Sequence, residues 1–222
     1  MNYNDFIVIT NRNLVEGDFI KQLEKIAKLK PYALILREKD LSENEYYKLA
    51  VKVQKICEKN KIKFFIHSHV QIAKKLGVKN IHLSIPNLKN ITNIVNTEDI
   101  ANTTSHPNND KYVNTYNLTY NDKLTSIQNP LLYFENISIS CHSMEDVNFA
   151  IKSNANQIIL GTIFETECKK GLKGKGLSFV KEITANCPIP VYAIGGIKED
   201  NIAAIKKAGA KGGCMMSGFM KY

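Results

Sequence analysis

Residues 190–218, PVYAIGGIKEDNIAAIKKAGAKGGCMMSG, contain one complete strand–helix–strand unit. Its two ends, Pro190–Ile194 and Gly213–Met216, are short apolar runs, typical of strands that are buried on both faces of a parallel sheet. Between them, Glu199–Ala208 carries apolar residues at helical spacing. The segment therefore predicts two parallel strands that are joined by a helical crossover.

The same pattern recurs towards the N-terminus. Six more short apolar runs have helical segments between most of them: residues 6–10, 33–36, 62–66, 80–83, 137–140 and 157–160. Eight strands that alternate with helices in 222 residues predict an α/β fold, a (β/α)8 TIM barrel in a single domain over residues 1–222. A doubly wound open sheet is the alternative, but no GxGxxG follows the first strand.

Two parts of the chain depart from a regular barrel. The stretch at about 96–133 is polar and irregular, and we expect it to hold a distorted fourth helix and a long loop. The predicted last strand ends at Met216 and Tyr222 follows soon after, so the eighth helix is expected to be missing or vestigial. A partner subunit could cover the wall left open there, and we therefore expect a homodimer or a higher homo-oligomer.

The charge of the chain is spread out. The formal net charge is +9, but among 30 basic residues only Arg12 and Arg37 are arginines, and the lysines occur along every predicted helix. Nucleic-acid binding predicts clustered basic and aromatic residues, so we expect no nucleic-acid partner. No apolar run is long enough for a membrane helix, and the N-terminus lacks the pattern of a signal peptide. We expect a cytoplasmic protein without a membrane partner, with its five cysteines reduced because none has CxxC spacing.

In TIM barrels the active site lies at the carboxyl ends of the strands. This rule selects the following residues: Arg37, Lys39, His67, Ser68, His69, Ser84, Asn87, Ser140, His142, Lys169, Gly195, Gly196, Ser217 and Gly218. Paired glycines after the seventh strand and Ser-Gly after the eighth would expose backbone N–H groups that can bind phosphate, although a tight turn would also explain the glycines.

Five side chains stand out among these positions. Arg37 is a better planar clamp for phosphate or carboxylate than lysine, and Lys39 follows it closely. His142 comes directly after the fifth strand, and imidazole exchanges protons near neutral pH. His67 and His69 are two residues apart, but no carboxylate follows at a spacing that would favour a metal site.

Four segments resemble the thiamine phosphate synthase superfamily: Leu36–Asp40, Ser140–Ser143, Ala193–Ile197 and Met215–Gly218. A fifth, Phe164–Gly176, is most similar to the TenI branch, whose members are thiazole tautomerases. The resemblance implies a role in thiamine biosynthesis, with a small anionic thiazole phosphate as the ligand and a TIM-barrel fold.

For a tautomerase, the resemblance implies an isomerase that needs no cofactor and no metal. His142 would be the catalytic acid and base. The other assigned positions would bind the ligand: Arg37, Lys39, Ser140 and Lys169 the anionic substrate, and Gly195, Gly196, Met216 and Ser217 its phosphate. We expect this activity.

The alternative is thiamine phosphate synthase (thiamine-phosphate pyrophosphorylase), which also binds a hydroxymethylpyrimidine pyrophosphate. Synthases of this superfamily hold Mg²⁺ with an Asn-Asp pair after the third strand and an Asp after the fourth. Here those positions are His67-Ser68 and Asn87, so Mg²⁺ would be a cofactor only if the synthase reading holds. A regulator that binds a thiamine-related phosphate without catalysis is a further alternative.

Overall fold

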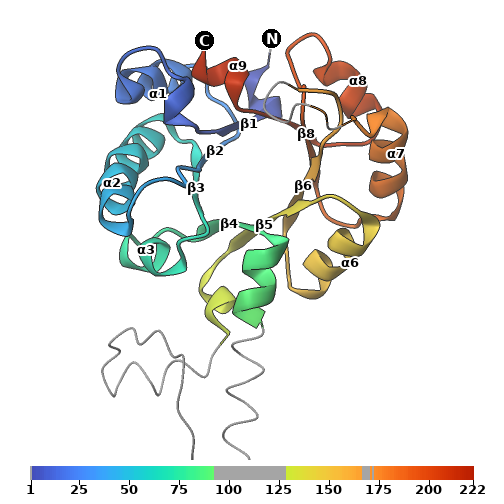
Figure 1. The fold of residues 1–222 in the computed structure, drawn as a ribbon, viewed down its shortest axis with the longest axis horizontal. Coiled ribbons are helices and arrows are strands. Elements are labelled where there is room, and N and C mark those ends of the chain that lie inside the picture. Colours follow the sequence, from blue (N-terminus) through green and yellow to red (C-terminus); the bar gives the residue numbers. More distant parts are fainter. Residues whose placement is uncertain (1, 93–128, 167–170, 172) are drawn as a thin grey trace, which may run out of the picture.

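The computed structural model describes residues 2–92, 129–166, 171 and 173–222. Eight parallel strands close into a barrel in the order of the sequence (Figure 1). The strands are β1 (Phe6–Ile9), β2 (Ala33–Leu36), β3 (Lys63–His67), β4 (Asn80–Ser84), β5 (Asn136–Cys141), β6 (Gln157–Gly161), β7 (Val191–Ile194) and β8 (Gly212–Met215). This confirms the predicted (β/α)8 barrel.

Helices surround the barrel on its outside (Figure 1). They are α1 (Phe19–Ala27), α2 (Glu43–Asn60), α3 (Val70–Lys75), α6 (Met144–Lys152), α7 (Gly176–Asn186), α8 (Ile202–Lys207) and α9 (Ser217–Met220). Residues 85–92 are also helical, and three 3-10 turns lie at η1 (Tyr3–Asp5), η2 (Arg12–Leu14) and η3 (Pro130–Tyr133).

Two helices differ from the prediction. The helix after β4 begins directly at residue 85, before the polar stretch in which we expected it, and residues 93–128 of that stretch lie outside the described part. Helix α8 begins at Ile202 rather than Glu199, because the side chain of Asn201 closes a turn. Its amide accepts from Lys198 N–H at 2.9 Å and donates to the Gly196 carbonyl at 2.9 Å.

The helix after β8 is vestigial, as predicted: α9 has four residues. It nevertheless covers β1 beside α1. Phe219 and Met220 are buried, and the Phe219 ring meets the Phe6 ring of β1 edge-on, with the centroids 6.1 Å apart. Gln22 of α1 donates to the Phe219 carbonyl at 2.8 Å. The part of the barrel that we expected a partner subunit to cover is therefore covered by α9 of the same chain. The homo-oligomer stays a prediction.

Alternation along the strands separates two cores. Outward-facing residues form the large core between the strands and the helices, and this core contains Ile81, Leu83, Ile137 and Ile139 of β4 and β5. The barrel interior is lined on one side by a smaller apolar cluster: Ile7, Ile9, Ala33, Ile35, Phe65, Ile159, Tyr192 and Cys214.

The β4–β5 side of the interior is polar. Asn136 donates to the side chain of Asn80 at 2.8 Å. Two residues further along β4, the His82 ring lies between Ser138 and Ser140, and each ring nitrogen is 2.9 Å from one serine hydroxyl oxygen. These residues are the inward-facing partners of the register between the two strands. The barrel therefore has one apolar and one hydrogen-bonded wall, and the polar wall leads up to the carboxyl ends of the strands.

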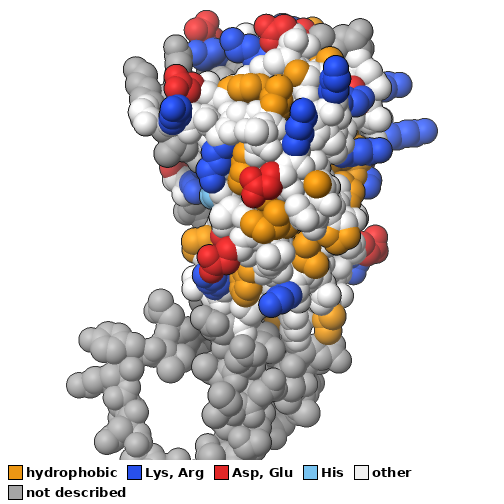
Figure 2. Space-filling view, turned by 90° about the vertical axis from the view of Figure 1, so that its right-hand side faces the viewer, with side chains coloured by type: hydrophobic (Ala, Val, Ile, Leu, Met, Phe, Trp, Pro, Cys, Tyr) orange, Lys and Arg blue, Asp and Glu red, His pale blue; other side chains and the backbone are white. Residues whose placement is uncertain are grey.

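The outer surface agrees with the expected dispersed charge. On the face over α6, α7 and α8, Lys and acidic side chains are interspersed and separated by neutral atoms (Figure 2). Within the described residues, no helix is both long and apolar enough to span a membrane. The four described cysteines, Cys57, Cys141, Cys187 and Cys214, are all free, and Cys168 lies outside the described part.

Candidate active site

Arg37 follows β2 at the barrel mouth, where its backbone N–H donates to Thr10 Oγ1 at 2.9 Å. Its side chain continues the inward-facing line of Ile35, and its positive charge acts on the buried rings of His67 and His82. Among the described residues, no acceptor or carboxylate pairs with the Arg37 guanidinium. A half-buried guanidinium without such a partner favours the binding of an anion.

Two neutral imidazoles lie beside Arg37. Burial, with the nearby charge of Arg37, lowers the pKa of His67 and of His82 from 6.5 to about 3 each. Their ring centroids are 5.8 Å apart, and His67 Nδ1 lies 3.1 Å from Ser68 Oγ. At neutral pH these rings add hydrogen-bonding groups to the mouth without adding charge.

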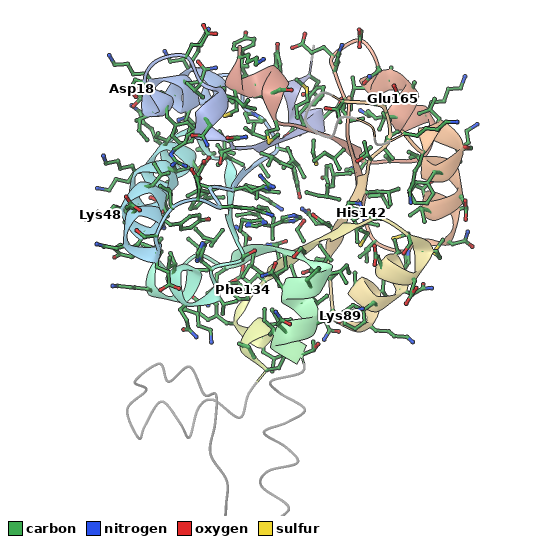
Figure 3. The ribbon with its side chains drawn as sticks, in the orientation of Figure 1. Asp18, Lys48, Lys89, Phe134, His142 and Glu165 are labelled. Carbon is green, nitrogen blue, oxygen red and sulfur yellow. The ribbon has the colours of Figure 1, made fainter. Side chains whose placement is uncertain are left out.

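His142 lies inside the ring of helices, beside β6 (Figure 3). Its Nδ1 is 2.7 Å from the carbonyl oxygen of Gly161, and since a carbonyl only accepts, Nδ1 carries the hydrogen. In the neutral ring Nε2 is then left with its lone pair. The backbone is held as well, because His142 N–H donates to Asp146 Oδ2 at 2.7 Å and the His142 carbonyl accepts from Lys175 Nζ.

Gly195 and Gly196 both adopt positive φ, +100° and +62°. A Cβ on Gly195 would lie 2.5 Å from Thr162 Cγ2, and one on Gly196 would lie 2.7 Å from Phe164 Cβ. The close approach of the β6–α7 and β7–α8 loops therefore requires glycine at both positions. The Gly196 N–H still has no acceptor within the described residues. The two glycines can therefore allow the close packing of the loops and also bind a phosphate.

The structure brings most of the predicted residues to one rim, since all eight strands are parallel and the barrel is closed. Arg37, Ser140, His142, Gly195, Gly196, Met216 and Ser217 all lie at or just beyond the carboxyl ends of their strands. Lys39 contributes positive charge at His67, and Met216 packs against the interior cluster. Lys169 lies outside the described residues.

His69 does not join the mouth. The chain turns at Ser68, which has φ of +66°, and the His69 ring then packs against Tyr46 with the centroids 4.2 Å apart. His67 and His69 thus face different surroundings, although they are only two residues apart.

The comparisons with known proteins decide the family. A family model described as thiamine monophosphate synthase matches residues 6–111 and 126–219. The chain belongs to this thiamine monophosphate synthase family. The superfamily resemblance stated from the sequence is thereby confirmed.

Relatives of the family point the same way. The chain is 30% identical over 213 residues to "Putative thiamine-phosphate synthase 2" of Aquifex aeolicus, covering 96% of each chain. It is 25% identical to the thiamine-phosphate synthase of Clostridium acetobutylicum, covering 99% of this chain and 88% of that one. The solved thiamine phosphate pyrophosphorylase of Pyrococcus furiosus matches 100% of this chain and 89% of its own with a TM-score of 0.71, and at 21% identity this likeness supports the fold alone.

These findings correct the predicted enzyme class. The sequence led us to expect an isomerase of the TenI branch, but these relatives are named as synthases, which are transferases. The isomerase prediction is wrong. It rested on the segment Phe164–Gly176 and on the missing acidic residues at the magnesium positions, whereas the synthase relatives match nearly the whole chain.

The residues at the family's magnesium positions do not fit Mg²⁺. His67 is a buried neutral imidazole, and the Ser84 hydroxyl at the end of β4 donates to the Asn87 side chain. Mg²⁺ prefers carboxylate and water oxygens, and the Arg37 and Lys39 charges that act on His67 would repel a cation. In the described ranges, no group of three His, Cys, Asp or Glu side chains could hold a metal.

Two features of the rim did not follow from the sequence. Lys175 reaches back from the start of α7 to His142, a contact that sequence spacing does not reveal. Arg12 binds Glu38 and Asp40, which alternate with Arg37 and Lys39 along the β2 loop. The rarity of arginine in this chain is the one signal that could have drawn attention to Arg12.

Proposed function

We propose that this chain is a thiamine-phosphate synthase. The observation that carries the proposal is the family match, which includes every described residue of the mouth from Arg37 to Ser217. The names of the bacterial relatives support it. The substrates would be a thiazole phosphate and a hydroxymethylpyrimidine pyrophosphate. Both are anions that suit a mouth where none of the described side chains pairs with the Arg37 guanidinium.

The chemistry of this transfer creates negative charge at the leaving group. The bond between the pyrimidine's methylene carbon and the pyrophosphate oxygen breaks, and the thiazole nitrogen bonds to that carbon. Arg37, with Lys39 beside it, would stabilise the departing pyrophosphate, because fixed cations act strongly where water is excluded. The neutral rings of His67 and His82 would not oppose this charge.

The proposal is tested by mixing the purified chain with both precursors and following thiamine phosphate by mass spectrometry. Product should form only when both precursors and the enzyme are present. If folded protein yields no thiamine phosphate with both precursors, with or without Mg²⁺, the proposed function is wrong.

We further propose that the site works without a divalent cation, because its donors at the metal positions are an imidazole, a hydroxyl and an amide. Excess EDTA should leave the affinity for inorganic pyrophosphate, measured by calorimetry, within about twofold of its original value. The double variant Ser68→Asp/Asn87→Asp restores two carboxylates and should make this affinity respond to Mg²⁺. Loss of pyrophosphate binding in EDTA by the unchanged protein would contradict this.

A further inference from the structure

Two buried hydroxyl groups hold the peptide bond that precedes Arg37, and we call Thr10 and Tyr46 the hydroxyl pair. The Leu36 carbonyl accepts from the Tyr46 hydroxyl at 2.6 Å, and the Arg37 N–H donates to Thr10 Oγ1 at 2.9 Å. The carbonyl and the N–H belong to one peptide unit, and both hydroxyl-bearing residues are fully buried. A peptide unit is planar, so holding both of its polar groups fixes the direction of the plane and the position of the Arg37 Cα.

The Tyr46 hydroxyl also reaches strand β3. It accepts from the His67 N–H at 3.2 Å, just past the last register pair of β2 and β3, which is Leu36 with Ile66. Burial raises the pKa of Tyr46 above its ordinary value, so the hydroxyl keeps the proton that it donates to the carbonyl. One hydroxyl thus joins the carboxyl ends of two neighbouring strands at the mouth.

Hydrogen bonds also fix the backbone of both members of the hydroxyl pair. Thr10 directly follows β1, and its own N–H donates to the Ile35 carbonyl at 3.1 Å. Tyr46 lies in the first turn of α2, where its N–H donates to the Ser42 carbonyl at 2.8 Å, and its ring packs against His69. Groups that are themselves held in place can set the direction of the group that they bind.

We propose that Thr10 and Tyr46 are positioning residues that orient Arg37 for binding a phosphorylated ligand at the mouth. The inference rests on the proposed function for the identity of that ligand. Among the described residues, no carboxylate pairs with the Arg37 guanidinium, so its direction depends on the backbone that carries it. An arginine that is oriented before the ligand arrives loses less conformational freedom on binding.

The test measures the affinity for inorganic pyrophosphate by calorimetry, with ligand concentrations up to the millimolar range for weak variants. Thr10→Val removes the hydroxyl with little change of shape and should weaken binding about fivefold, whereas Thr10→Ser keeps the hydroxyl and should stay within about twofold. Tyr46→Phe should also weaken binding about fivefold, because the Leu36 carbonyl loses its donor. Full affinity in Thr10→Val or in Tyr46→Phe would overturn the proposal for that residue.

A double-variant cycle distinguishes positioning of Arg37 from a general structural role. If Thr10 acts through Arg37, Thr10→Val should weaken binding by less than about twofold in protein that already carries Arg37→Ala. An equal loss in both backgrounds would overturn the proposal, because the hydroxyl would then act without the guanidinium. If Thr10→Val does not fold, Tyr46→Phe with and without Arg37→Ala makes the same comparison.

Matched controls remove hydroxyl groups of the same kind far from the mouth. Tyr32 directly precedes β2, at the other end of the strand from Arg37, and its hydroxyl accepts from Lys63 Nζ at 3.1 Å. Thr184 of α7 donates to the Ala208 carbonyl at 2.9 Å. Tyr32→Phe and Thr184→Val should leave pyrophosphate binding unchanged, and a loss in them equal to that in the hydroxyl pair would overturn the proposal.

The outcomes for this inference and for the proposed function can be told apart. Pyrophosphate binding that follows the expected pattern without synthase turnover would refute the proposed function and leave the roles of the hydroxyl pair standing. Synthase turnover in protein that does not bind pyrophosphate would overturn the inference and leave the proposed function standing.

Discussion

Replacement of Arg37 by alanine is expected to lower kcat/KM for thiamine phosphate formation by about 100-fold or more, or about 3 kcal/mol. The Arg37 guanidinium lies half-buried at the mouth, and no side chain of the described residues neutralises it. A phosphorylated substrate would supply the missing charge. Steady-state kinetics with the pyrophosphate ester as the varied substrate measures the effect.

The stability of the same variant separates binding from a structural role. A partly buried cation without a partner costs folding free energy, so Arg37→Ala should melt at or above the temperature of the unchanged protein. Lys48→Ala is the control, because Lys48 is exposed on the outer side of α2 (Figure 3) and should change neither activity nor stability. Full activity in Arg37→Ala would refute its assignment to the anion site.

The strands and the positions at their carboxyl ends depend mainly on local sequence. Each strand could be predicted because short apolar runs such as 33–36 and 157–160 are buried on both faces and need no knowledge of their partners. The rim positions followed from the strand ends. The sequence also contains the alternation behind the polar wall of β4 and β5, in Ser138, Ile139 and Ser140. The sequence alone does not show that the serines face the barrel interior and Ile139 the helices.

The features that could not be predicted depend on contacts between distant segments. Arg12 meets Glu38 and Asp40 across 26 and 28 positions, and nothing in the spacing indicates that the chain brings them together. The enzyme class failed for a different reason. The prediction relied on one segment, Phe164–Gly176, and on the missing acidic residues at the magnesium positions, whereas the whole-chain likeness supports a synthase.

The buried histidines predict a steep loss of stability in mild acid. His67 and His82 have their pKa values lowered from 6.5 to about 3 by burial, so below pH 6.5 the unfolded chain takes up protons that the folded chain does not. Above pH 6.5 both states are neutral and the effect vanishes. At pH 5 each histidine should lower the free energy of unfolding by about 2 kcal/mol, or about 4 kcal/mol for the two together.

Urea unfolding at several pH values between 7.5 and 5 measures this slope directly. The window excludes Asp40, whose pKa of about 2 places its loss of stabilisation at lower pH. His82→Gln keeps groups that can hydrogen-bond to Ser138 and Ser140 but cannot take up a proton, so the pH dependence of its unfolding free energy should be less steep. The remaining slope comes from His67 and from His69, whose pKa burial also lowers. An unfolding free energy that does not change between pH 7 and 5 would mean that the barrel interior stabilises charged imidazole. The mouth would then repel a cation much less than the charge of Arg37 and the neutral rings beside it imply.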